Sequence, residues 1–260
     1  MPGPRWIDLS YGVGVHAARF GVIMSGLLLA PLLGITGWYA GLFVNVLCAG
    51  FAAGLVTYLG LWKRIGLTTW WRGRTAALLL LVPLGEALLW LLPDGLVEEP
   101  PGYALWALTL LLVGFNEELI SRGVVLERLR GSFGAYSAVG LTAALFGAQH
   151  LSAFATTSRG GYDIATNVLV SGCYGFALAA FQFRFVWIWP LMLIHGFADF
   201  TTILTAGGLG DALVGVTLVV FVGYGILVLR GRDGPGGIRE DAAGPVPTTA
   251  GAELRHPLGA

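Results

Sequence analysis

Charge is scarce in this sequence. Only 12% of the 260 residues are charged, whereas 56% are hydrophobic and the formal net charge is zero. A soluble domain has about 25% charged residues, so the composition is too apolar for that class. Lys63 is the one lysine and no basic cluster occurs, which argues against a nucleic-acid partner. The sequence instead indicates a protein that lies in a membrane.

Several other features are missing. The strand alternation of a transmembrane barrel is absent, and no internal repeat is visible. The two cysteines, Cys48 and Cys173, both lie inside apolar stretches, which favours packing over a disulfide or redox role. These absences leave an α-helical membrane protein as the expected class.

Apolar stretches of about 18 to 22 residues recur along the chain, and each is long enough to cross a hydrocarbon layer of about 30 Å. They predict an all-α, polytopic membrane protein with about eight transmembrane helices around a polar intramembrane cavity. The expected spans are about 17–37, 40–62, 75–92, 103–122, 135–153, 164–183, 186–206 and 211–229.

Basic residues predict the orientation of these spans. With eight spans, nearly all of the arginines and Lys63 fall on one side, which the positive-inside rule assigns to the cytoplasm together with both termini. The expected domains are a cytoplasmic segment at 1–16, a membrane domain at 17–229 and a disordered, Gly- and Pro-rich cytoplasmic tail at 230–260. The excess of arginine over lysine, with abundant Ala and Gly, favours a bacterial inner (cell) membrane.

Ionisable groups inside predicted spans are costly and are usually functional. Three segments each carry two polar or aromatic residues four positions apart, which places the pair on one helix face. These segments are EELISR, FGAQH and HGFAD. The intramembrane ionisable residues are Glu86, Glu117, Glu118, Arg122, His150, His195 and Asp199.

The spacing suggests separate roles for the two adjacent glutamates. They lie about 100° apart around a helix, which predicts that they face different partners. We expect Glu118 to pair with Arg122 one turn away, so that Glu117 is free to face His150 and a water molecule. Glu86 has no evident partner and is interpreted as structural or cavity-lining.

Two roles remain open for His195 and Asp199. They could stabilise the oxyanion of a scissile carbonyl. Alternatively, His150, His195, Asp199 and Glu117 could bind a divalent metal, zinc in particular. No cofactor is certain, and the metal-free water mechanism is preferred.

The three segments resemble the motifs of the CPBP family of intramembrane proteases, which includes CAAX prenyl endopeptidases and bacteriocin-processing or self-immunity proteins. EELISR fits EExxxR, FGAQH fits FxxxH and HGFAD fits HxxxN/D, in that order. The resemblance covers about residues 75–205 and implies an eight-helix protease in which Glu117, His150, His195 and Asp199 are catalytic. It implies supporting roles for Glu118, Arg122 and Phe146. The family more often has Asn where this chain has Asp199.

The expected function is therefore an intramembrane endopeptidase that cleaves a membrane-associated protein or peptide. If the zinc site described above is present, the enzyme is a metalloprotease. A proton-coupled transporter and a non-catalytic immunity or binding protein are the alternatives. Membrane lipid and a peptide or protein substrate are the expected partners. Gly50 and Gly54 make a small-xxx-small step that would also suit a helix-mediated oligomer.

Overall fold

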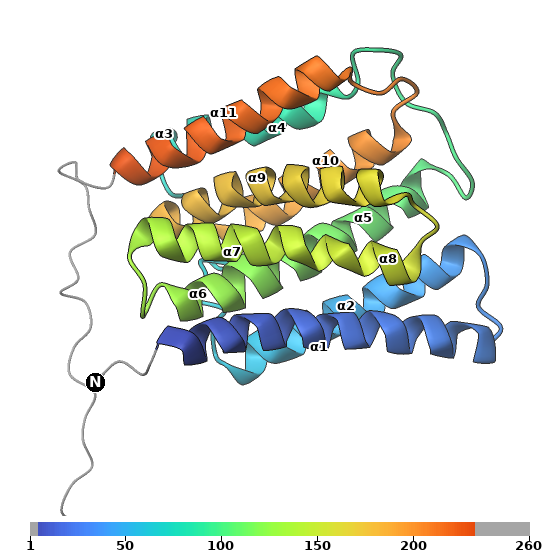
Figure 1. The fold of residues 1–260 in the computed structure, drawn as a ribbon, viewed down its shortest axis with the longest axis horizontal. Coiled ribbons are helices and arrows are strands. Elements are labelled where there is room, and N and C mark those ends of the chain that lie inside the picture. The colour runs from blue at the N-terminus through green and yellow to red at the C-terminus, as the bar shows by residue number, and fades with distance from the viewer. Residues whose placement is uncertain (1–4, 232–260) are drawn as a thin grey trace, which may run out of the picture.

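The computed structural model describes residues 5–231, and helices make up most of this part (Figure 1). Six helical stretches are long and apolar enough, by length and composition, to cross a membrane. A helix satisfies its own backbone groups, which the bilayer interior cannot do. The predicted all-α, polytopic fold is confirmed. The six are α1 (Arg5–Leu32), α2 (Trp38–Tyr58), α5–η1–α6 (Tyr103–Glu118, Leu119–Val125, Leu126–Leu129), α7–η2–α8 (Ala135–Gln149, His150–Ser152, Ala153–Thr156), α9 (Gly161–Phe185) and α11 (Asp211–Arg230).

Two of the eight predicted spans are shorter than a full crossing. The stretch predicted at 75–92 forms α3 (Arg74–Leu79) and α4 (Leu81–Leu89), which are separated at Leu80. The stretch predicted at 186–206 forms α10 (Ile188–Leu204), an apolar helix below the length of the other six. Each predicted stretch is thus helical, but the count of eight full-length spans is not confirmed.

The first helix begins much earlier than predicted. The expected span was 17–37, whereas α1 begins at Arg5. Its first half carries Asp8, His16 and Arg19, and these polar side chains are buried against other helices. The hydropathy pattern missed this part of the helix because its polar residues are buried against other helices and do not face water. The domain boundaries at 16 and 229 stay predictions, and nearly all of the predicted tail lies outside the described residues.

Both ends of the described chain lie at one end of the helix bundle (Figure 1), and several basic side chains make contacts there. The contacts there join the start of α1, the 59–73 connection, the α6–α7 turn and the end of α11. They are Arg5 Nε to Ser132 O, Arg128 to Asp8, Arg64 to Glu127, and Arg184 to Val228 O. The charge asymmetry that motivated the orientation is therefore present in space, and its assignment to the cytoplasm stays a prediction.

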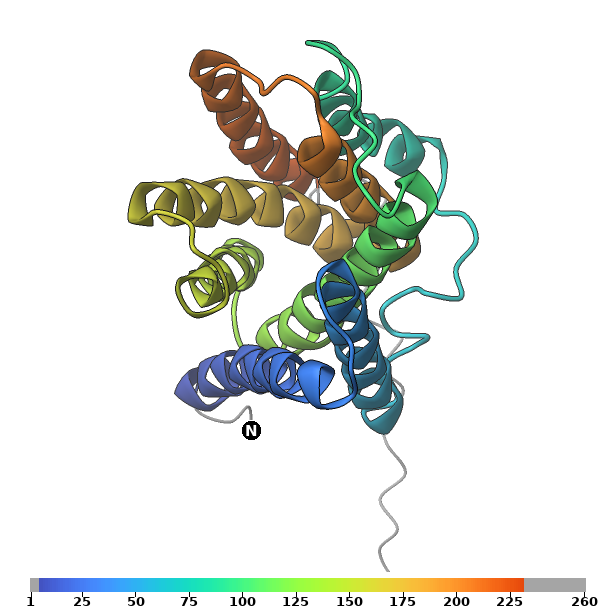
Figure 2. The same ribbon diagram turned by 90° about the vertical axis from the view of Figure 1, so that its right-hand side faces the viewer.

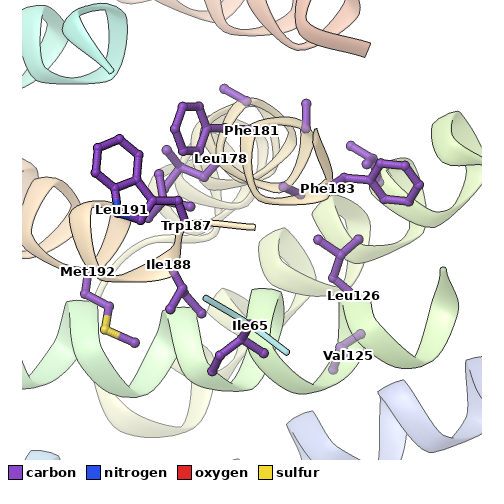
Figure 3. Packing of buried hydrophobic residues seen from close by; sticks show 14 of the residues in the cluster. Ile65, Val125, Leu126, Leu178, Phe181, Phe183, Trp187, Ile188, Leu191 and Met192 are labelled. Atoms are coloured by element: carbon purple, nitrogen blue, oxygen red, sulfur yellow. The ribbon is translucent and has the colours of Figure 1, made fainter. Parts of the chain in front are cut away.

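The apolar core lies beside this basic end, where η1 and α6 meet α9 and α10 (Figure 3). All seven residues of η1 are buried, so this segment packs on every side. Figure 3 shows side chains from four segments that converge there. They include Ile65, Val125, Leu126, Leu178, Phe181, Ile188 and Leu191.

Glycine allows α5 and α10 to approach backbone to backbone, and the two helices cross near the middle of the bundle (Figure 2). A Cβ atom at Gly114 would lie 2.5 Å from Met192 O and 2.7 Å from Gly196 N. A Cβ atom at Gly196 would lie 2.8 Å from Leu110 O. Small residues are the usual means by which membrane helices come this close. Gly196 follows His195, so this crossing sets the position of the imidazole.

Gly114→Ala should destabilise the protein, because the added methyl group meets backbone atoms that cannot rotate away. We expect a loss of about 1–3 kcal/mol, the range for overpacking a filled interior. The measurement is the unfolding midpoint in detergent, by heat or by titration with a denaturing detergent. Gly140→Ala in α7 is the matched control, because a Cβ atom there meets nothing within 4 Å. Equal losses in the two variants would contradict the close crossing.

Candidate functional site

The EELISR segment spans a change in helix type. Glu117 and Glu118 are the last residues of α5, and Arg122 lies in η1, which is a π-helix. Short π-helical segments within α-helices are frequent at functional sites. Arg122 Nη1 lies 2.9 Å from Glu118 Oε1, and both side chains are 0% exposed. The predicted Glu118–Arg122 pair is therefore present, fully enclosed by protein.

Arg122 is held by more than its carboxylate. Its guanidinium carbon lies 4.0 Å from the centre of the Phe146 ring, and its Nη2 donates to Gly175 O at 3.4 Å. A guanidinium over an aromatic face gains energy from the ring quadrupole, particularly where water is excluded. A Cβ atom at Gly175 would lie 2.8 Å from the Phe146 ring, so glycine leaves space for both side chains. Phe146 therefore packs against the guanidinium of Arg122.

His195 connects the acidic residues of the site. Its Nδ1 and Glu118 Oε1 are 2.8 Å apart. Its Nε2 lies 3.8 Å from Glu117 Oε2 and 3.7 Å from Asp199 Oδ2. The prediction that the two glutamates face different partners is wrong, because one imidazole presents a separate nitrogen to each. His195, Asp199, Glu117 and Glu118 form one cluster.

His150 lies at the first residue of η2, where α7 ends. Its Nδ1 is 3.0 Å from Phe146 O, which leaves Nε2 available. The Phe146 ring stands edge-on to both imidazoles, at 5.4 Å from His150 and 5.7 Å from His195 between ring centres. His150 and Glu117 are close enough to interact electrostatically, but within residues 5–231 no hydrogen bond joins them. The three motifs therefore do converge on one site, with Phe146 between the two histidines.

Arg19 on α1 is a site residue that the sequence analysis missed. Its Nη2 donates to Glu117 Oε1 at 2.8 Å, and its Nε donates to Asn116 Oδ1 at 2.8 Å. Both ends of the Arg19–Glu117 pair are buried. The predicted first span began at residue 17, so Arg19 was counted as a cytoplasmic anchor. A charge inside an apolar helix was the available signal, since such a charge needs an internal partner.

Two further polar residues, His16 and Glu86, lie near the site. His16, one turn before Arg19, is buried, and its Nδ1 is 3.0 Å from Gln149 Oε1. Glu86 accepts a hydrogen bond from Trp90 Nε1 at 2.8 Å and interacts electrostatically with Asp199. Glu86 is remote from the motifs in sequence but not in space. Its role in lining a cavity stays a prediction.

The donor atoms do not form a metal-binding set. Among residues 5–231, no group of three or more His, Cys, Asp or Glu side chains is arranged to hold a metal ion. One oxygen of Glu117 is occupied by Arg19, and one nitrogen of His195 is occupied by Glu118. The zinc alternative, with His150, His195, Asp199 and Glu117 as ligands, therefore does not fit the geometry.

What the cluster can do chemically follows from its free atoms. His195 Nε2 lies 3.8 Å from Glu117 Oε2 and 3.7 Å from Asp199 Oδ2, and both separations are beyond direct hydrogen bonding. Polar atoms at such a separation are commonly bridged by water. The Asp199 side chain is 30% exposed, so the cluster is reached from the Asp199 side. This arrangement suits a carboxylate that takes a proton from water.

Comparison with known proteins identifies one family. Residues 99–201 match the family described as Type II CAAX prenyl endopeptidase Rce1-like, and this range holds all three motifs. The match confirms the suspected family. No curated protein and no solved structure matches the chain. Together with the six apolar helices, the family match indicates a multi-pass membrane protein.

Arg19→Leu should destabilise the protein strongly, because Glu117 would remain buried without a cation. Breaking one side of a buried ion pair costs about 3–5 kcal/mol. The Arg19→Leu/Glu117→Gln double variant should recover part of this loss, as measured by unfolding midpoints in a double-mutant cycle. Arg159→Leu is the control, because its pair with Asp163 is exposed. Additive effects of the two substitutions would refute the coupling.

Proposed function

On the premise that residues 99–201 match the Rce1-like type II CAAX prenyl endopeptidase family, we propose that this chain is an intramembrane endopeptidase that hydrolyses a peptide bond of a membrane-associated protein or peptide. The observation that carries the proposal is the state of Glu117. Arg19 holds Oε1 of this carboxylate, while Oε2 lies 3.8 Å from His195 Nε2, a separation that polar atoms commonly bridge through water. Glu117 is then the general base.

The reaction begins with water held near Glu117 Oε2. This oxygen takes a proton from the water while the water oxygen bonds to the carbonyl carbon of the scissile peptide. The carbonyl becomes an oxyanion, which needs a hydrogen-bond donor. The Nδ1–H group of His150 donates to Phe146 O, so His150 supplies that donor from Nε2 as an imidazolium, in which both ring nitrogens carry a proton. When the carbon–nitrogen bond breaks, Glu117 returns the proton to the leaving amine.

His195 and Asp199 position the water. His195 donates from Nδ1 to Glu118 Oε1, and this bond holds its Nε2 between Glu117 and Asp199. Asp199 is an acceptor when ionised and so cannot donate to an oxyanion. It serves instead to orient His195 and the water, which accounts for an acid at the position where the family more often has Asn. Glu118 and Arg122 support the site without touching the reacting atoms.

Glu117→Gln should abolish turnover even in the folded protein, because the amide keeps the shape of the side chain but cannot take a proton. Loss of the charge that pairs with Arg19 should also lower the unfolding midpoint. Glu118→Gln should first lower abundance and the unfolding midpoint, because it removes the partner of Arg122. Quantitative terminal-peptide proteomics of membranes from wild-type and Glu117→Gln cells measures the first effect and also finds the substrate. Immunoblotting of the same membranes measures the second.

Identical terminal peptides in the two strains would overturn the protease proposal. Solute uptake driven by a pH gradient in proteoliposomes would then support the transporter alternative. Complementation of a deletion by Glu117→Gln would support the non-catalytic one.

Chelation should leave activity unchanged, because Arg19 binds one oxygen of Glu117 and Glu118 binds one nitrogen of His195, and no group of three or more His, Cys, Asp or Glu side chains among residues 5–231 is arranged to hold a metal ion. The measurement is turnover of the substrate found by proteomics, before and after treatment with a strong chelator, together with the metal content of the purified protein. Loss of turnover that added zinc restores would show that the metal-free mechanism is wrong.

A further inference from the structure

A pocket of about 380 Å³ lies between α1, the end of α7 and α8. Its walls are mostly apolar and include Phe20, Leu145 and Phe154. Its polar part is formed by His16, Arg19 and Gln149. Arg19 also binds Glu117, so the pocket and the proposed catalytic site share this side chain. A ligand in the pocket would therefore lie against a side chain that binds the proposed general base.

Two buried atoms at the pocket lack partners. Across residues 5–231, neither His16 Nε2 nor Gln149 Nε2 makes a hydrogen bond. The two side chains bind each other through His16 Nδ1 and Gln149 Oε1. If His16 donates in that bond, its Nε2 is a free acceptor and the Gln149 amide is a free donor. If the amide is flipped, the roles reverse, so the pair offers one donor and one acceptor in either case.

One donor beside one acceptor is the complement of a peptide backbone, which presents one C=O and one N–H group per residue. An extended peptide in a membrane must satisfy both groups, because unpaired backbone groups there cost several kcal/mol. A lipid acyl chain has neither group and would leave both buried atoms unpaired. The volume also lies in the range of ligand pockets.

We propose that this pocket is the substrate subsite that takes an apolar segment flanking the scissile bond, an inference that rests on the proposed endopeptidase function. The backbone of one substrate residue pairs with His16 and Gln149, and its apolar side chains contact Phe20, Leu145 and Phe154. The subsite includes α1, which lies outside the residues that match the family. Helix α1 thereby contributes to substrate choice as well as to the position of Glu117.

The test uses the full chain in detergent micelles and a pool of fluorogenic peptides that carry Leu, Ala or Asp at each position. Wild type should prefer Leu at one position next to the cleaved bond. Ala17→Phe places a ring in the pocket and should lower kcat/KM for Leu peptides about tenfold relative to Ala peptides. Ala18→Phe is the matched control, since Ala18 is the next residue of α1 but does not line the pocket. Equal preferences in wild type and both variants would overturn the proposal.

A second variant tests the backbone pairing separately. Gln149→Leu should raise KM for all peptides by about 2- to 10-fold, the worth of one hydrogen bond, without changing the Leu preference. An unchanged KM would show that the amide does not contact substrate. Unfolding midpoints of all variants are compared with wild type, so that a loss of fold is recognised.

A binding measurement separates this inference from the proposed function. A Leu peptide that carries a photoreactive diazirine is crosslinked to Glu117→Gln protein, which needs no turnover. Adducts on α1 or α8 that disappear with Ala17→Phe would support the subsite even if no peptide were cleaved. A co-purified lipid in wild type that is displaced by Ala17→Phe, with no peptide adducts, would show that the pocket is a lipid site and would overturn the proposal.

Discussion

Two adjacent carboxylates inside an apolar helix bundle each need a cation, and the rest of the site follows from how these are supplied. Arg122 lies one turn beyond Glu118 on the same helical stretch, whereas Arg19 reaches Glu117 from α1. An isolated buried charge costs several kcal/mol even after relaxation. The Glu118–Arg122 pair therefore fixes the orientation of η1, and the Arg19–Glu117 pair links α1 to the end of α5.

The chemistry also depends on how closely the helices approach. His195 can contact Glu118 only if α10 lies against α5, and Gly114 and Gly196 allow this. On the other side, a Cβ atom at Gly147 would lie 2.7 Å from Val168 O, so α7 and α9 are also in close contact. In a membrane no hydrophobic force brings helices together, and small residues that allow tight packing take over that role. Two of these glycines belong to the motifs themselves, in HGFAD and FGAQH.

Sequence reasoning found the motif residues and their convergence but was less accurate about their partners. The i, i+4 spacing placed Glu118 beside Arg122, and the structure has this pair. The same angular argument predicted that Glu117 and Glu118 face different partners. This prediction is wrong, because the two nitrogens of the His195 imidazole face one glutamate each. Hydropathy located every helical stretch, yet it misplaced the start of α1. Hydropathy averaged over a sequence window cannot distinguish a polar residue that faces water from one that is bound by a residue of another helix.

Local spacing and composition determined the helical class and the site residues on α5, α7 and α10. They also determined that the two residues of each i, i+4 pair share one helix face. These features depend only on helical periodicity and on the cost of charge in lipid. Tertiary structure decided which partner each residue has. Arg19 and Glu117 are 98 positions apart, as His195 and Glu118 are 77 apart. No periodic pattern links positions so distant. Their contact arises from the packing of whole helices, and that packing joins α1 to the site.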